Sequence, residues 1–262
     1  MRVCVLGSGS SGNCTFVETR RTRVLIDNGF GPRSLKRRLQ EAGLPLDRFD
    51  ALLITHGHID HWKGAESFVH TYQAPVYTNL GTRNEVEALN QIDRWEEFRT
   101  GESFVVGDLE VDPFPVLHDA ADPVGFRLRC GGVAGAVATD LGSLTDAVEE
   151  RLSGCDWMVL ESNHDEELLR LGPYPWSLKQ RLTSRLGHLS NRAFASFLTR
   201  FDGQARHVFL AHLSCKNNDP EIALDTARAG LDRRPSGTFH DLWNPIQLHL
   251  TKQTRPTAVV EL

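Results

Sequence analysis

Residues 51–61 have the sequence ALLITHGHIDH, which combines an apolar run with a cluster of polar side chains. Its first part, Ala51–Thr55, is apolar or β-branched and predicts a short buried strand. The strand runs without a spacer into His56, His58, Asp60 and His61, so four potential metal ligands fall within six residues. A strand end followed by a tight turn can direct His56 and His58 toward one metal ion, while Asp60 and His61, one turn on, can serve a second. An exposed histidine-rich loop is the alternative, but it does not explain why the ligands come directly after a buried strand.

Six residues cannot complete two metal sites, so further ligands must come from distant loops. Three candidates follow apolar runs that predict strands: His118 after Val111–Leu117, Asp140 after Val133–Thr139 and His212 after Val208–Ala211. Taken singly, a histidine at a strand end is more often structural, and an aspartate before a helix is usually an N-cap. Three such residues after the histidine motif favour metal ligation instead. Imidazole and carboxylate suit zinc, manganese or iron, so the ligands leave the metal open.

The composition is that of an ordinary globular chain. Of the 262 residues, 40% are hydrophobic and 24% charged, and the formal charge of −5 excludes a strongly basic coat but not a local basic patch. The apolar runs are far shorter than the roughly 20 residues that span a bilayer, and the N-terminal one is too short for a signal peptide. The five cysteines are odd in number and lack a C-x-x-C spacing, so we expect reduced thiols and a cytoplasmic protein.

Short β-branched runs and amphipathic segments share the chain without a composition boundary, which predicts an α/β fold and one domain over residues 1–262. Strands are expected at 2–6, 14–19, 23–27, 51–55, 104–106, 110–117, 124–129, 133–138, 157–160, 207–210 and 245–250. Helices are expected at 34–42, after 64, around 83–89, and at 144–152, 177–186, 191–201 and 221–230. Residues 251–262 show no period, and we expect a loosely held tail.

The His-x-His-x-Asp-His motif, followed by His118, Asp140 and His212, resembles the metallo-β-lactamase superfamily, and more narrowly its YycJ-like (WalJ-like) family. The resemblance extends over residues 7 to 218, most of the chain. The segments that carry it are Gly7–Asn13, His118–Phe126, Glu161–Asp165, Gly172–Arg181, Gly187–Asn191 and Ala211–Asn218.

The resemblance implies a four-layer αββα sandwich with two divalent metal ions, Zn²⁺ or Mn²⁺, at one edge. It assigns the ligands as follows: one metal is held by His56, His58 and His118, the other by Asp60, His61 and His212, and Asp140 bridges the two. The large β-CASP insertion of some branches is absent, because 262 residues leave no room for it.

A site with these two metal ions is expected to catalyse hydrolysis. Two metals about 3.5–4 Å apart can hold a bridging hydroxide and polarise a phosphoryl or carbonyl oxygen. Asp60 is a ligand that could also orient this nucleophile or accept its proton. By the family resemblance, a bridging Asp140, where β-lactamases commonly have a cysteine, favours phosphodiesterases and thioesterases. The family resemblance implies a 5′-to-3′ exonuclease acting on DNA or RNA.

Two other functions stay open at this point. The first is a small-molecule metallo-hydrolase that cleaves a nucleotide phosphodiester or a thioester. Such an enzyme needs no row of Lys and Arg side chains along its surface. The second is a non-catalytic metal-binding protein, against which the full ligand set argues.

Residues 177–191 could meet a phosphate backbone, although a solvated basic helix face explains the charges equally simply. We expect substrate contacts from Lys179, Arg181, Ser190, Asn191 and His164, with Arg185 close by. By resemblance to tRNA-maturing enzymes, His188 assists proton transfer or binds phosphate. His164 either lines the site or orients ligands.

The Gly7–Asn13 loop lacks the lysine of a phosphate-binding loop, so we expect a tight turn with Ser10 and Asn13 available for hydrogen bonds to the site. The remaining histidines have no comparable context and are expected to be structural or exposed: His70, His207, His240 and His249.

Overall fold

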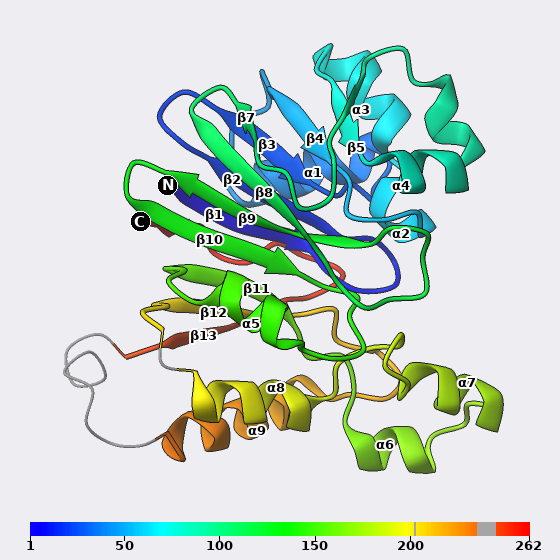
Figure 1. Ribbon diagram of the computed structural model, residues 1–262, viewed down its shortest axis with the longest axis vertical. Helices are drawn as coiled ribbons and strands as arrows, with labels where there is room; N and C mark the ends of the chain where they lie inside the picture. The colour runs from blue at the N-terminus through cyan, green and yellow to red at the C-terminus, as the bar shows by residue number, and fades with distance from the viewer. Residues whose placement is uncertain (202, 235–244) are drawn as a thin grey trace. The chain divides into compact units, whose positions relative to one another are not determined.

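The computed structural model describes residues 1–201, 203–234 and 245–262, and it divides into two compact units (Figure 1). The first unit contains Met1–Pro115, Ala120–Val133 and Lys252–Leu262. The second contains Val116–Asp119 and Ala134–Thr251. Among the described residues, no helix combines the length and the apolarity that crossing a membrane requires.

The first unit is built on a mixed sheet. Antiparallel pairing joins its first strands, and parallel pairing joins the rest from β3 onward. The strand order is β14 (Val260–Glu261), β1 (Arg2–Gly7), β2 (Cys14–Glu18), β3 (Arg23–Ile26), β4 (Ala51–Leu53), β5 (Val76–Thr78) and β6 (Trp95–Glu97). An antiparallel meander of β7 (Phe104–Val106), β8 (Leu109–Pro115) and β9 (Val124–Cys130) belongs to the same unit.

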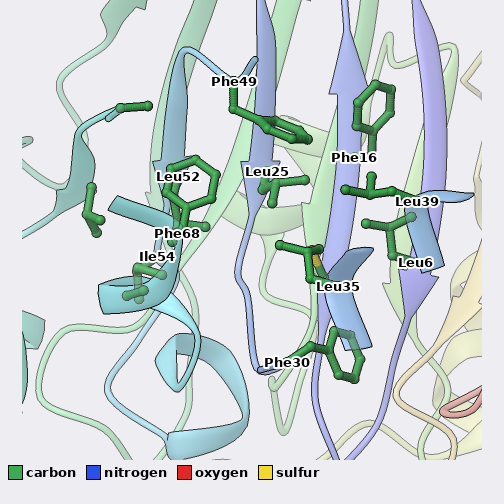
Figure 2. Close-up of a cluster of buried hydrophobic side chains, with 14 of the residues drawn as sticks. Leu6, Phe16, Leu25, Phe30, Leu35, Leu39, Phe49, Leu52, Ile54 and Phe68 are labelled. Carbon is green, nitrogen blue, oxygen red and sulfur yellow. The ribbon is translucent and has the colours of Figure 1, made fainter. Parts of the chain in front are cut away.

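Helices cover one face of this sheet because their apolar side chains enter the same core as those of the strands. The helical segments of the unit are α1 (Pro32–Glu41), α2 (Ile59–Trp62), α3 (Ala65–Tyr72), α4 (Leu80–Glu85) and the 3₁₀ turn η1 (Glu87–Gln91). Leu35 and Leu39 of α1 pack with Phe16 and Leu25 of the strands, as Figure 2 shows. The ring of Phe49 lies 6.1 Å from that of Phe16. This packing fixes β3 and β4.

The second unit contains four strands joined by parallel pairing, in the order β13 (Gln247–Leu250), β12 (His207–Ala211), β11 (Trp157–Glu161) and β10 (Val133–Ala138, of which Val133 falls in the first unit). Its helices are α5 (Asp146–Leu152), α6 (Glu166–Leu171), α7 (Trp176–Leu182), α8 (Asn191–Arg200) and α9 (Pro220–Asp232). Figure 1 shows α6 and α7 together, to one side of the pair formed by α8 and α9.

The predicted α/β fold is confirmed, and most expected strands and helices are present within a few residues of their expected ends. The helix α2, the strands β5 and β6, the helix α6 and the strand β14 were not expected. The prediction of a single domain over residues 1–262 stays a prediction.

The loosely held tail is corrected by the structure. The backbone N–H of Ser8 donates to the oxygen of Lys252, and Arg38 donates to the oxygen of Gln253 at 2.6 Å. Further along, β14 pairs with β1, with Val260 opposite Val3. Backbone hydrogen bonding of this kind holds a segment in place without an apolar period that a sequence could reveal.

Candidate metal centre

The histidine motif stands at the carboxyl end of β4, beside the carboxyl end of β3. Parallel pairing of Ile26 with Leu53 brings the two strand ends to the same sheet edge. His58 is the N-cap of α2, and this single turn carries Asp60 and His61. The ring of His56 lies 4.0 Å from that of His61 and 4.8 Å from that of His58. The motif therefore gathers its three imidazoles, as the spacing predicts.

Asp27, the first residue after β3, orients this group and was missed by the sequence reasoning. Its Oδ2 lies 2.7 Å from Nδ1 of His61, and its Oδ1 accepts from the backbone N–H of Thr55 at 2.9 Å. The Thr55 hydroxyl lies 2.9 Å from Nδ1 of His56. Burial raises the pKa of Asp27, although the neighbouring His61 opposes this shift. The signal that could have identified Asp27 is a carboxylate that directly follows a buried strand.

The Gly7–Asn13 loop reaches the same group, as expected for Asn13. The Asn13 side-chain amide lies 3.2 Å from Oδ2 of Asp60 and 3.0 Å from Nε2 of His61. Its carbonyl oxygen accepts from the backbone N–H of Gly9, which closes the turn. Ser10 is exposed.

In the second unit, parallel strands again deliver polar side chains to one sheet edge. Glu161 is the last residue of β11, Asp140 lies two residues after β10, and His212 follows β12 directly. With His188, which lies just before α8, these residues place one potential ligand atom each within 4.8 Å of one another. Asp140 and His212 both adopt positive φ, at 56° and 55°, an uncommon conformation that is often found at functional sites.

Glu161 organises this cluster and was not predicted as a site residue. Its Oε1 lies 2.7 Å from Nδ1 of His188 and 2.9 Å from Nδ1 of His212. Its Oε2 accepts from the backbone N–H groups of Leu141 and Leu189. Burial alone would raise the pKa of Glu161, but the charge and hydrogen bond of His188 and the hydrogen bond of His212 lower it to about 2. The negative charge of Glu161 and its hydrogen bond raise the pKa of His188 in turn, against the effect of burial.

His118 is held in the same manner. Its Nδ1 donates to the backbone oxygen of Gly187 at 3.0 Å. Its Nε2 lies 3.3 Å from Asp119 and 3.9 Å from Oδ1 of Asp140. Burial lowers the pKa of His118, although the charges of Asp140 and Glu161 oppose this, so the neutral imidazole is favoured. Neutral imidazole is the form that binds a metal.

The donor set fits a divalent metal. In each of His56, His61, His118 and His212, Nδ1 contacts an oxygen atom. Such a contact fixes the ring and favours Nε2 as the ligand atom, an arrangement typical of metal sites. With oxygen and nitrogen donors only, these His/Asp clusters suit zinc, manganese or iron.

The predicted substrate-binding residues divide into two groups. Arg181 is near the cluster: its Nε donates at 2.5 Å to Asp119, the neighbour of His118. Lys179 is engaged elsewhere, because its ammonium group donates to the backbone oxygens of Arg170 and Gly172, both at 2.7 Å.

The other three predicted contacts lie along one segment. Ser190 is the N-cap of α8 and also donates to Glu166. Asn191 is buried, and its side-chain oxygen accepts from Ser162 at 2.7 Å. His164 is 2% exposed and forms a β-bridge with Ser190. Their contacts with substrate stay predictions.

The histidines without a motif context are not all alike. His70 is exposed, and its Nε2 lies 3.7 Å from Glu66. His207 and His249 lie side by side, with Nδ1 of the first 3.0 Å from Nε2 of the second. His240 lies outside the described residues.

Comparison with known proteins relates this chain to a known superfamily and to two named nucleases. The beta-lactamase superfamily domain matches residues 22–213. The exodeoxyribonuclease YycJ of Bacillus anthracis is 34% identical over 262 residues, 97% of each chain. The exodeoxyribonuclease WalJ of Streptococcus pneumoniae is 35% identical over 225 residues, 84% of each chain.

The solved structure of the metallo-β-lactamase fold protein YhfI from Bacillus subtilis matches 97% of this chain and 98% of its own, with a TM-score of 0.71 and 15% identity. This likeness confirms the predicted fold. The chain therefore belongs to the β-lactamase superfamily, within it to the family of the YycJ and WalJ exodeoxyribonucleases, and it is a metal-dependent hydrolase.

Proposed function

We propose that this protein is a dimetal-dependent exonuclease that degrades DNA from a 5′ end. The observation that carries the proposal is the likeness, along 97% of both chains, to a relative named exodeoxyribonuclease. The oriented histidines of both units support it, because a nuclease of this fold depends on its metals.

The proposed ligands are those that the resemblance assigns. One divalent ion is bound by His56, His58 and His118, and the other by Asp60, His61 and His212, with Asp140 between them. When bound, such ions activate a water molecule and neutralise charge on a phosphodiester. Asp27 and Glu161 support the ligand set by fixing the rings of His61 and His212.

The chain itself supplies proton transfer and orientation. Asp60 orients the attacking water in this proposal, with its own carboxylate positioned by the Asn13 amide. His188 donates a proton to the leaving oxygen. The buried Glu161 carboxylate stabilises the protonated form of His188 through a 2.7 Å contact with Nδ1. With Nδ1 bonded to Glu161, the proton on Nε2 of the protonated ring is the one that His188 would give to the leaving oxygen as the P–O bond breaks.

The test is cleavage of end-labelled DNA and RNA, single- and double-stranded, by metal-stripped protein to which Mn²⁺ or Zn²⁺ is added back. The proposal predicts metal-dependent shortening of DNA from its 5′ end, a rate that falls steeply with salt, and no cleavage by His58→Ala. Shortening from the 3′ end would overturn the polarity, and equal or faster cleavage of RNA would overturn the preference for DNA.

A small-molecule phosphodiesterase or thioesterase is the second candidate. One observation favours it. The ammonium group of Lys179 donates to backbone oxygens, so it does not add to a row of cations that could bind the backbone of a polynucleotide. The same assay decides: turnover of a small phosphodiester or thioester without cleavage of any polymer would establish it.

A further inference from the structure

Helix α7 leaves an unusual surface exposed. Among the described helices of the second unit, it alone contains no buried residue. The Trp176 side chain at its start is 72% exposed. Leu171 before the helix and Leu186 after it are 71% and 47% exposed. A large exposed aromatic side chain, with exposed leucines a few residues away in the sequence, indicates a surface that contacts a partner.

The charge around α7 is one-sided. From Trp176 to Leu186 the sequence contains Lys179, Arg181 and Arg185 and no Asp or Glu, in a chain whose formal charge is −5. Arg181 forms an ion pair with Asp119, and Arg185 is exposed. Such a stretch complements a polyanion and not an acidic or mixed protein surface.

The helix is held in position by contacts that do not use its exposed face. Lys179 donates to the carbonyl oxygens at the end of α6, where a cation also interacts favourably with the helix dipole. After the helix, the backbone of Ser184 and Arg185 packs directly on Gly142. A Cβ at Gly142 would lie 2.4 Å from the oxygen of Ser184, so only glycine permits this approach.

The exposed face of α7 combines an aromatic ring with cations. At 100° per residue, Trp176, Gln180 and Arg181 share the solvent side, while Leu178 and Leu182 are half-buried on the other side. Arg185 follows three residues after the helix and is exposed.

This face is continuous with the cluster around Asp140. Arg181 contacts Asp119, the neighbour of His118. Beyond the helix, the backbone N–H of His188 donates to the oxygen of Leu182 at 2.9 Å, and the His188 ring belongs to the cluster itself.

We propose that α7 is a stacking platform for a single-stranded DNA segment, on which Trp176 stacks against a base while Arg181 and Arg185 contact the flanking phosphates. The proposal rests on the function proposed above. Base–aromatic stacking tolerates any sequence, because every base offers a π-face. An enzyme that removes successive nucleotides needs such tolerance.

The test measures binding of a fluorescein-labelled single-stranded DNA with cleavage-resistant phosphorothioate linkages to Mn²⁺-loaded protein, by fluorescence anisotropy. Trp176→Ala should weaken binding about tenfold, and Trp176→Phe should recover most of the loss, since stacking needs a ring. Arg185→Gln should weaken binding and lower the slope of log affinity against log salt by about 0.7.

Matched controls come from α9 of the same unit. Ile222→Ala and Arg228→Gln remove an exposed apolar group and an exposed cation there, and both should bind and cleave DNA like the wild type. Because Trp176 is largely exposed, its variants should melt at the wild-type temperature.

The outcomes separate the two proposals. Wild-type affinity in Trp176→Ala, by a protein that does cleave DNA, would overturn the platform alone and leave the apolar face to a protein partner. Absence of DNA cleavage and DNA binding in the wild type would overturn the proposed function and the platform with it.

Discussion

Two buried carboxylates, Asp27 and Glu161, hold the Nδ1 atoms of histidines in both units. For Asp27 the consequence is measurable. Asp27→Asn keeps a residue type that tolerates the positive φ of 57°, but it replaces an ionised acceptor of the His61 proton by an amide. Metal affinity should fall about 10- to 100-fold, as measured by competition with a chelator. Asp47→Asn, which alters an exposed carboxylate, is the control, and unchanged affinity in Asp27→Asn would refute the role of Asp27.

His188 is expected to matter only where the leaving oxygen needs a proton. His188→Ala should slow cleavage of DNA about 10²- to 10⁴-fold, because general acid catalysis is lost. In a p-nitrophenyl ester of a nucleotide, the leaving group is p-nitrophenolate, which needs no proton to depart. Hydrolysis of this ester should therefore change little in His188→Ala. Parallel kinetics on both substrates make the comparison, and equal losses would show that His188 acts otherwise.

Cys4 should make stability depend on alkaline pH. Burial raises its pKa from 9.0 to about 11, so above pH 9 the thiol ionises in the unfolded chain before it ionises in the folded one. Folding stability is therefore lost as pH rises. Between pH 8.5 and 10.5 the free energy of unfolding should fall by ~1.5 kcal/mol more in the wild type than in Cys4→Ala. Urea denaturation measures this difference, and identical pH dependence in both proteins would contradict it.

At the residue scale, candidate metal ligands are easier to recognise in the sequence than the groups that orient them. His56, His58, Asp60 and His61 are recognisable because their side-chain types and spacing are specific. Glu161 at the end of β11 and Asp27 after β3 belong to no such pattern. A single acidic residue at a strand end usually indicates a turn or a helix cap. Their roles depend on which loops fold beside them.

Gly135 shows how closely the strands of the second unit approach one another. It lies opposite Trp157 in the pairing of β10 with β11, and a Cβ there would lie 1.8 Å from the indole ring. Gly135→Ala should therefore lower the free energy of unfolding by about 3 kcal/mol or more. Gly31→Ala, where a Cβ meets nothing within 4 Å, should cost less than about 1 kcal/mol. Denaturant titrations of both variants give the comparison, and similar losses would argue against the close contact.

Elements differ in how visible they are to sequence reasoning. Long amphipathic or β-branched runs predict α1, α8 and β1 because the period repeats. The strands β5 and β6 contain three residues each, and α2 contains four, too few for a period to show. The helix α6 carries an N-cap, since Asp165 accepts from the backbone N–H groups of Glu167 and Leu168, but its six residues escape detection.

At the scale of the whole molecule, the fold class follows from the sequence because the candidate ligands stand at the ends of apolar strands, where sites of α/β proteins are commonly found. The return of residues 252–262 to β1 does not follow. It depends on edge pairing and on backbone oxygens that accept from Arg38 and Ser8, and neither contact leaves a hydrophobic pattern.

In the proposed dimetal centre, the ligand set that contains His58 and the ligand set that contains His212 are both needed to hold the metal ions. Metal content per chain, measured by mass spectrometry after dialysis, tests this requirement most directly in the wild type, His58→Ala and His212→Ala, with the exposed His70→Ala as control. We expect ~2 equivalents in the wild type and in His70→Ala, and a clear loss in both other variants. Retention of the full metal content by either His58→Ala or His212→Ala would contradict this requirement.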